Sequence, residues 1–230
     1  MKITLISDTH NKHKQVSEDY FDGDLILHAG DISSMGYEHE IENFFKWYDS
    51  LRPELKFFIA GNHDWGFQNN VDKVNMILNS FKTIEYLQDS EAIIQVGDEP
   101  EVKIYGTPWQ PEFYSWAFNL PRMGEELKSI WDNIPNDTDI LITHGPPFGY
   151  LDDVTGRRGQ HLGCELLIER IKTIKPKICV FGHIHSGYGH YYDGHTHYFN
   201  ASVLDERYMH TQSPWVIDWN PITNEIKFIR

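Results

Sequence analysis

The sequence is poor in cysteine, in long apolar runs and in positive charge. Its 230 residues include only two cysteines, Cys164 and Cys179, and they lack the close spacing of a metal knuckle. We therefore expect reduced thiols in an intracellular protein and no disulfide framework. A chain of this length can bury a sizeable core without disulfides or a structural metal.

No apolar run approaches the roughly 20 residues needed to cross a bilayer, so we expect no membrane span. The apolar start, residues 1–6, turns polar at Ser7-Asp8. That start is too short for a signal peptide and has no cleavage site of small residues. These absences predict a cytoplasmic protein.

The formal net charge of -14 excludes general nucleic-acid binding, because an acidic surface repels the phosphate backbone. It does not exclude a small phosphate ester, since bound divalent cations would reverse the local potential. The 13 histidines stand out beside this charge. Histidine is the commonest metal ligand and the usual acid–base group near neutral pH.

Short apolar runs alternate with segments of helical spacing, which predicts an α/β fold with helices covering a buried sheet. The strand-length runs are Ile3–Ile6, Leu25–Leu27, Phe57–Ile59, Ile140–Ile142 and Ile178–Phe181. The helical segments are Ile41–Leu51, Val71–Phe81, Gly124–Trp131 and Leu162–Ile174. The chain has no internal repeat or long linker, so we expect a single domain over residues 1–230.

Two regions break this alternation. Residues 84–105 have the pattern of consecutive short strands, and Trp215–Trp219 with Glu225–Ile229 has the pattern of a β-hairpin. We expect these regions to form a second sheet packed on the first. The predicted fold is a four-layer α-β-β-α sandwich, with two mixed sheets flanked by helices.

Each of the five apolar strands ends in a polar cluster that contains glycine or proline. The clusters are Ser7-Asp8-Thr9-His10, His28-Ala29-Gly30-Asp31, Ala60-Gly61-Asn62-His63-Asp64, Thr143-His144-Gly145-Pro146-Pro147 and Gly182-His183-Ile184-His185. Open α/β sheets place ligand sites outside the carboxyl ends of their strands. Side chains far apart in sequence are therefore expected to converge on one spot.

The residue types in these clusters predict a metal site. Imidazole, carboxylate and one amide oxygen suit Mn, Fe or Zn better than a soft copper ion. The candidate ligands are Asp8, His10, Asp31, Asn62, His144, His183 and His185. Seven ligands exceed the needs of one tetrahedral ion, so we expect two ions, roughly 3.5–4 Å apart. Asp31 is the natural bridge, because each carboxylate oxygen can bind one ion.

In these blocks the chain resembles the calcineurin-like metallophosphoesterase superfamily, whose pattern is D-x-H, G-D, G-N-H-D/E, a lone H and G-H-x-H. All five blocks occur in order between residues 8 and 185. Residues 106–114, 116–119 and 187–189 resemble its branch of small, cyclic-nucleotide phosphodiesterase-like proteins. Some members of that branch have lost a histidine of the last block. This chain keeps both, which favours an active enzyme.

The resemblance implies a role for each residue. Asp8, His10, Asp31 and His185 would hold one metal, and Asp31, Asn62, His144 and His183 the other. His63 would protonate the leaving oxygen, and Asp64 would accept a hydrogen bond from His63 and orient it. The expected reaction is hydrolysis of a small phosphoester, most simply a phosphodiester and with a cyclic nucleotide as one candidate, by a hydroxide held between the metals. Mn²⁺ is the ion we expect to support activity in vitro.

Several interpretations stay open. The aromatic residues Trp109, Phe113, Tyr114, Trp116 and Phe118 are either core or a wall for a base or aryl group. Arg157 and Arg158 are either solvated charges or phosphate contacts. A nucleotide-binding module or an interaction scaffold is the alternative to an enzyme, because fold does not settle function. The complete set of ligands together with His63 favours the enzyme.

The remaining histidines receive simpler assignments. His28 is expected in the core, and His13 near the mouth of the metal site. His39, His161 and His210 are expected at the surface without partners. A polar hairpin would expose His190, His195 and His197. Asn200-Ala201-Ser202 follows a strand near the site and is expected to help position loops.

Overall fold

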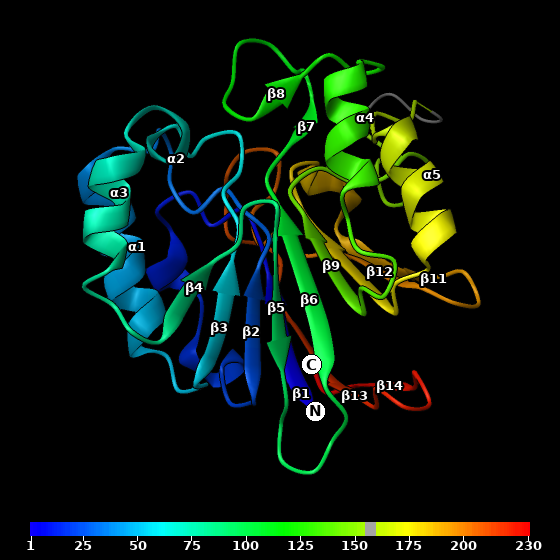
Figure 1. Ribbon diagram of the computed structural model, residues 1–230. Coiled ribbons are helices and arrows are strands. Elements are labelled where there is room, and N and C mark those ends of the chain that lie inside the picture. The colour runs from blue at the N-terminus through cyan, green and yellow to red at the C-terminus, as the bar shows by residue number, and fades with distance from the viewer. Residues whose placement is uncertain (155–159) are drawn as a thin grey trace.

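The computed structural model describes residues 1–154 and 160–230, so Arg157 and Arg158 lie outside the described residues. Two six-stranded mixed sheets face each other, and helices cover both outer sides (Figure 1). The outer layers are α1 (Glu38–Ser50) and α3 (Val71–Leu78) on one side, and α4 (Glu125–Asp132) and α5 (Glu165–Ile174) on the other. The predicted four-layer α-β-β-α sandwich is therefore confirmed.

The first sheet has the order β14-β13-β1-β2-β3-β4. Its parallel strands are β1 (Lys2–Ile6), β2 (Leu25–His28), β3 (Leu55–Phe58) and β4 (Ile84–Tyr86). The hairpin of β13 (Trp215–Trp219) and β14 (Ile226–Phe228) adds antiparallel strands beside β1. The short helix α2 (Gly66–Asn69) precedes α3.

The second sheet has the order β11-β12-β10-β9-β6-β5. Its parallel strands are β6 (Val102–Thr107), β9 (Ile140–Thr143), β10 (Ile178–Phe181) and β12 (His197–Asn200). Antiparallel strands close its edges, β5 (Ser90–Ile94) beside β6 and β11 (Gly189–Tyr192) beside β12. The short strands β7 (Gln110–Pro111) and β8 (Asn119–Leu120) pair apart from both sheets.

The composition of the two sheets differs from the expectation. The C-terminal hairpin and β4 join the first sheet, and two of the five apolar runs, β9 and β10, join the second. The cause is pairing between residues distant in sequence, such as Ile3 with Ile217. The hairpin itself is confirmed.

The central strands are mostly apolar because both of their faces are covered. Ile140 and Ile142 pack between the two sheets, whereas Leu141 between them packs under α4 and α5. In the first sheet, Leu25 and Leu27 face the second sheet, and Ile26 packs under α1. Since side chains alternate along a strand, burial on both faces requires a continuous apolar run. The polar groups of the central strands consequently gather at their ends.

The small helices and the thiols complete the description. Single 3-10 turns occur at His13–Gln15, Glu18–Tyr20 and His185–Gly187. Cys164 and Cys179 are free and buried, as expected for reduced thiols. Within residues 1–154 and 160–230, the helices are too short or too polar to cross a membrane.

Candidate metal centre

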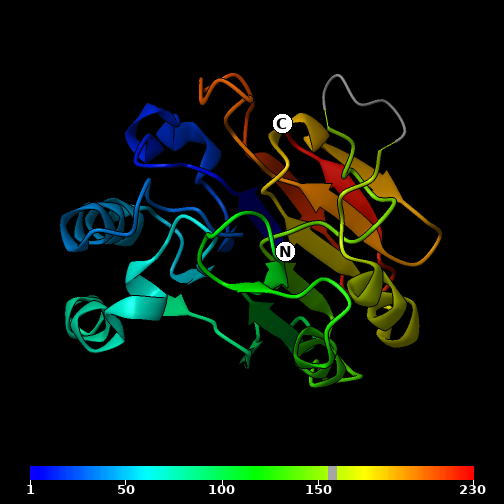
Figure 2. The same ribbon diagram turned by 90° about the horizontal axis from the view of Figure 1, so that it is seen from above.

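The polar clusters after β1, β2, β3, β9 and β10 meet at the end of the sandwich that Figure 2 shows from above. Four of their residues other than glycine have a left-handed backbone, with φ of 55° at Asp8, 39° at His10, 54° at Asp31 and 66° at His183. Such strained conformations in residues other than glycine persist where the surroundings hold them, and they gather at functional sites. The sharp turns direct these side chains toward one point.

One group of donors surrounds the Asp8 carboxylate. His185 Nε2 lies 3.3 Å and His10 Nε2 lies 3.9 Å from Asp8 Oδ1. One ligand atom from each of these three residues falls within 4.8 Å of the others. His10 Nε2 also lies 3.5 Å from Asp31 Oδ2, which connects this group to the next.

A second group surrounds His144. Its Nε2 lies 3.3 Å from Asp31 Oδ2 and 2.9 Å from Asn62 Oδ1. The ring of His183 lies 5.1 Å from the His144 ring, measured between centroids. Asp31 thus stands between the two groups, and the structure brings all seven sequence-predicted ligands together.

Hydrogen bonds behind the site fix these side chains. Nδ1 of His144 lies 2.9 Å from the Ala29 carbonyl, and Nδ1 of His185 lies 2.9 Å from the Asp205 carbonyl. Each carbonyl accepts the proton of Nδ1, so Nε2 of both rings is left as the inward ligand atom. Asp8 Oδ2 accepts a hydrogen bond of 2.7 Å from the Ser202 hydroxyl.

Burial and charge shift the titration of the site. Burial alone would raise the pKa of Asp31, but His144 and His10 outweigh it and hold that pKa well below its ordinary value. Burial lowers the pKa of His144, but the Asp31 carboxylate outweighs it and raises the pKa to about 9. Asp8 likewise raises the pKa of His185 to about 9 against burial. The buried carboxylates therefore favour positive charge beside them.

The donor set fits divalent cations. The carboxylates, the amide oxygen and most of the imidazoles are buried, which leaves few of their contacts to water. Neither ring nitrogen of His10 has a hydrogen-bond partner among the described residues, although the side chain is buried. A buried polar group without a partner is costly and rare, and a metal ion would satisfy it. A divalent ion would also displace the protons that the carboxylates favour on His144 and His185.

His63 lies beside this site, and its side chain is held by contacts different from those of the predicted ligands. Its Nδ1 lies 2.8 Å from the Ser34 carbonyl, and its backbone N–H donates to Asp31 Oδ1 at 2.8 Å. The ring meets the His10 ring edge-on at 4.6 Å. Its Nε2 is therefore the nitrogen left for chemistry.

The expected hydrogen bond from His63 to Asp64 is wrong. The Asp64 carboxylate instead accepts from the backbone of Ile32, Ser33 and Gly61 at 2.8–3.1 Å and from the Ser33 hydroxyl at 2.6 Å. Burial and the nearby Asp31 raise the pKa of Asp64 to about 7, against the effect of these donors. Asp64 therefore ties together the two loops that carry Asp31 and His63, and it acts on His63 only through the backbone.

The aromatic segment has three different environments. Phe118 is buried against Trp109, with ring centroids 5.4 Å apart. Trp116 stacks on His63, and only Phe113 and Tyr114 face solvent. The last two line a cleft of about 610 Å³ together with His183 and Tyr208. The core interpretation holds for Trp109 and Phe118, and the wall interpretation fits Phe113 and Tyr114.

Three positions at the site have little or no signal in the sequence. The Ser34 carbonyl orients His63, and a backbone group leaves no mark in the residue type. Tyr208 lies in an irregular loop, with its ring 4.9 Å from that of His10 and 5.4 Å from that of His185. Trp116 is only one of several aromatic residues in its segment. Ser202 contacts Asp8, in agreement with the expected positioning role of residues 200–202.

The other histidines are partly as expected. His28 is buried, and its Nε2 lies 3.1 Å from the Thr9 hydroxyl. His13 does not lie at the mouth of the site, because it is buried against Phe44 and Trp47. His161 has a partner, with Nδ1 2.6 Å from Asp152 Oδ1.

The remaining expectations concern the hairpin and two surface positions. The hairpin of β11 and β12 exposes His195 but buries His197, whose Nδ1 lies 3.1 Å from His190 Nε2. His39 is exposed, as expected, whereas His210 is half-buried.

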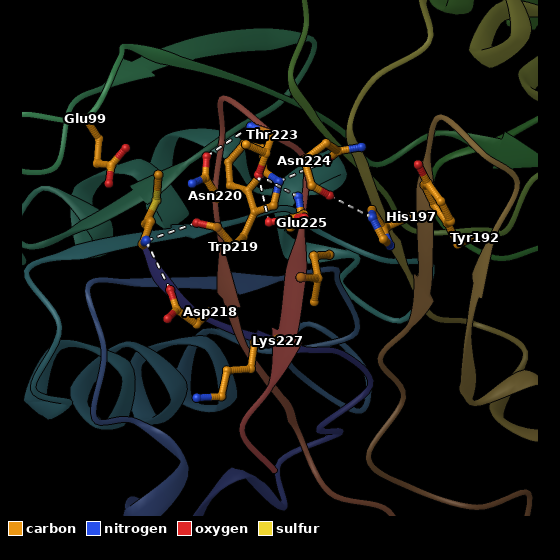
Figure 3. A pocket seen from close by; sticks show the side chains of 12 residues that line it. Glu99, Tyr192, His197, Asp218, Trp219, Asn220, Thr223, Asn224, Glu225 and Lys227 are labelled. Atoms are coloured by element: carbon orange, nitrogen blue, oxygen red, sulfur yellow. Dashed lines mark hydrogen bonds and ion pairs between the residues drawn. The ribbon is translucent and has the colours of Figure 1, made fainter.

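A second hollow, of about 750 Å³, lies at the β13–β14 hairpin (Figure 3). Its polar groups pair with one another: His197 Nε2 lies 3.1 Å from the Asn224 carbonyl, and Trp219 Nε1 donates to Asn224 Oδ1 at 3.0 Å. The side chain of Asn220 accepts from two backbone amides of the hairpin turn. These pairs stabilise the turn, and volume alone does not make this hollow a site.

Comparison with known proteins gives a consistent family. A family model described as Calcineurin-like phosphoesterase matches residues 1–187. Human metallophosphoesterase domain-containing protein 1 is 39% identical over 238 residues, which cover 94% of this chain and 70% of the human protein. A 3',5'-cyclic-nucleotide phosphodiesterase of Nostoc is 25% identical over 169 residues, which cover 72% of this chain and 57% of that protein.

A solved structure supports the fold. The crystal structure of a protein from Thermus thermophilus aligns with a TM-score of 0.66 at 12% identity. The alignment covers 99% of this chain and 97% of the other. At this identity the similarity supports the four-layer architecture alone.

Proposed function

The chain belongs to the calcineurin-like phosphoesterase family and is a metal-dependent phosphoesterase, and we propose that it hydrolyses a phosphodiester at a two-metal site, with a cyclic nucleotide as the leading candidate. The proposal rests on the position of the Asp31 carboxylate. Its Oδ2 lies 3.5 Å from His10 Nε2 and 3.3 Å from His144 Nε2, between the two groups of donors.

In this proposal two divalent ions would be held, and Asp31 would belong to both sets of ligands. Asp8, His10 and His185 would complete one set, and Asn62, His144 and His183 would complete the other. When bound, the two cations supply a nucleophile from water at neutral pH and offset negative charge on the phosphoryl oxygens. Imidazole and carboxylate ligands suit Mn²⁺, which we propose as the ion that supports activity in vitro.

His63 acts as the general acid. In the doubly protonated ring Nδ1 donates to the Ser34 carbonyl, and Nε2 carries the second proton, which passes to the leaving oxygen as the bond to phosphorus breaks. Such proton transfer is typically worth about 10²–10⁴-fold in rate. The cytoplasmic location remains a prediction, and so does a catalytic role for Asp64.

Two observations support a diester with a planar group. Phe113, Tyr114 and Tyr208 line the cleft beside His183 and His185, and clefts for planar ligands are commonly aromatic. The name of the Nostoc relative gives a cyclic nucleotide as its substrate.

The test is a substrate panel on metal-stripped protein reloaded with Mn²⁺. We expect turnover of bis-p-nitrophenyl phosphate and of 3',5'-cyclic AMP that exceeds turnover of the monoester p-nitrophenyl phosphate. A preference for the monoester would reject the diester. Binding of metal and nucleotide without turnover would replace the hydrolase with a nucleotide-binding module.

A further inference from the structure

The face of the His63 ring is covered by Trp116. The two rings stack with centroids 4.1 Å apart and an angle of 29° between their planes. The edge contact with His10 and the bond from Nδ1 to the Ser34 carbonyl restrain the same ring from other directions. An imidazole that carries a proton to a leaving group must keep its orientation, and these contacts limit rotation of the ring.

The loop between β7 and β8 holds Trp116 in this place. Directly after Trp116, the backbone N–H of Ala117 donates to the Asn62 carbonyl at 3.1 Å. The next N–H, of Phe118, donates to Gln68 Oε1 at 2.9 Å. Phe118 is buried and has a φ of 53°, a conformation that bulky residues adopt only under constraint. The loop is thus anchored to the segment that carries His63.

Trp116 differs in exposure from its aromatic neighbours in the same loop. Phe113 and Tyr114 are exposed, whereas Trp116 is half-buried. One face of its indole is already taken by the imidazole. Its effect should therefore fall on His63, and substrate affinity should change little.

We infer that Trp116 is a positioning residue that aligns His63 Nε2 with the leaving oxygen. This inference rests on the proposed role of His63. During hydrolysis the oxygen of water forms the new bond to phosphorus and gives up a proton to solvent, and the bond to the leaving oxygen breaks. The ring regains a proton from solvent after each turnover. The Nε2 proton neutralises the departing oxygen, so poor leaving groups depend most on its alignment.

The experiment compares two diesters that differ in their leaving group. Diphenyl phosphate releases phenol, which needs protonation, and bis-p-nitrophenyl phosphate releases a far better leaving group. For Trp116→Leu we expect kcat on diphenyl phosphate to fall about 10- to 100-fold, since a displacement of about 1 Å can cost about 10²-fold. The loss on bis-p-nitrophenyl phosphate should be several times smaller, with KM and metal content unchanged.

Three further variants separate positioning from general destabilisation. Trp116→Phe keeps a stacking ring and should recover most of the diphenyl phosphate rate. Ser115→Ala, an exposed neighbour in the same loop, should keep the wild-type ratio of the two rates. In a His63→Ala background, Trp116→Leu should cause no further loss on diphenyl phosphate, because coupled residues are not additive.

The outcomes are distinct. An equal loss on both esters that persists in the His63→Ala background would mean that Trp116 supports only the fold, and the inference would fail. Unchanged rates on both esters in Trp116→Leu would also overturn it. Full activity of His63→Ala would remove the general acid of the proposed function itself, and the inference would fall with it.

Discussion

Gly61 offers a direct test of how closely the metal-binding loops approach each other. A Cβ added at this position would overlap both the Oδ1 and the backbone nitrogen of Asp31, and it would lie 2.7 Å from Cε1 of His144. The obstacle at Asp31 includes backbone, so it cannot be relieved by rotating a side chain. We predict that Gly61→Ala displaces the Asp31 carboxylate from its place between the two groups of donors.

The expected size follows from overpacking. Forcing extra atoms into a packed region typically costs about 1–3 kcal/mol. In a chain of this length each kcal/mol lowers Tm by roughly 2–4 °C, so the expected loss is roughly 2–12 °C. The effect on catalysis is larger, because a misplacement of about 1 Å can cost about 10²-fold in rate.

Gly145→Ala is the matched control. Gly145 also adjoins a proposed ligand, His144, but the closest atom to its added Cβ is Cβ of Gln110 at 3.4 Å, an ordinary contact. We would measure bound metal per chain, Mn²⁺-dependent turnover and Tm for both variants. Gly145→Ala should keep its metals. Retention of both metals and of full turnover in Gly61→Ala would refute the reasoning, and equal losses in the two variants would show that contact at Asp31 is not the cause.

Three further predictions concern the metals and acid stability. Ser202→Ala removes the hydroxyl that donates to Asp8 at 2.7 Å. Metal affinity, measured by titration, should fall about 10- to 100-fold, as it does when the hydrogen-bond partner of a metal ligand is lost. Unchanged affinity would contradict this prediction. Removing the metals with a chelator should lower Tm, because an ion present at about 1,000 times its Kd stabilises the fold by roughly 4 kcal/mol. A Tm that does not depend on metal would reject a metal site in the folded protein. Burial lowers the pKa of His13 to about 4 in the folded protein, against about 6.5 in the unfolded chain. As the pH falls, the unfolded chain binds the proton first. The free energy of unfolding should therefore fall by about 2 kcal/mol between pH 7 and pH 5 because of His13. His13→Leu should reduce the fall in Tm over that range, and an identical fall would show that His13 does not titrate in this way.

The ligand cluster could be predicted because it lies at strand ends. A buried strand carries apolar residues on both faces, so polar residues directly after it mark the edge of the sheet. Asp8 after β1 and His183 after β10 are separated by 175 residues, yet the His183 backbone N–H donates to both Asp8 oxygens at 3.1 Å. β1 and β10 belong to different sheets, and the packing of the two sheets face to face brings their carboxyl ends to the same end of the sandwich.

The pairing of the strands and the orientation of His63 could not be predicted in the same way. The side chains of β13 alternate as they would in either sheet, and only contact with β1 decides its place. The partner of His63 is a carbonyl of Ser34, a group that every residue carries. Residue type favoured Asp64, whose carboxylate is instead committed to backbone amides and to the Ser33 hydroxyl.

The central claim is a pair of metals that share Asp31. The most direct measurement is the number of Mn²⁺ ions bound per chain, together with turnover of bis-p-nitrophenyl phosphate, in the parent and in Asp31→Asn. Asp72→Asn, on the exposed side of α3, is the control. We predict two ions per chain in the parent and the control, and loss of both ions and of turnover in Asp31→Asn. A parent with one ion, or an Asp31→Asn variant that loses only one, would contradict a shared carboxylate.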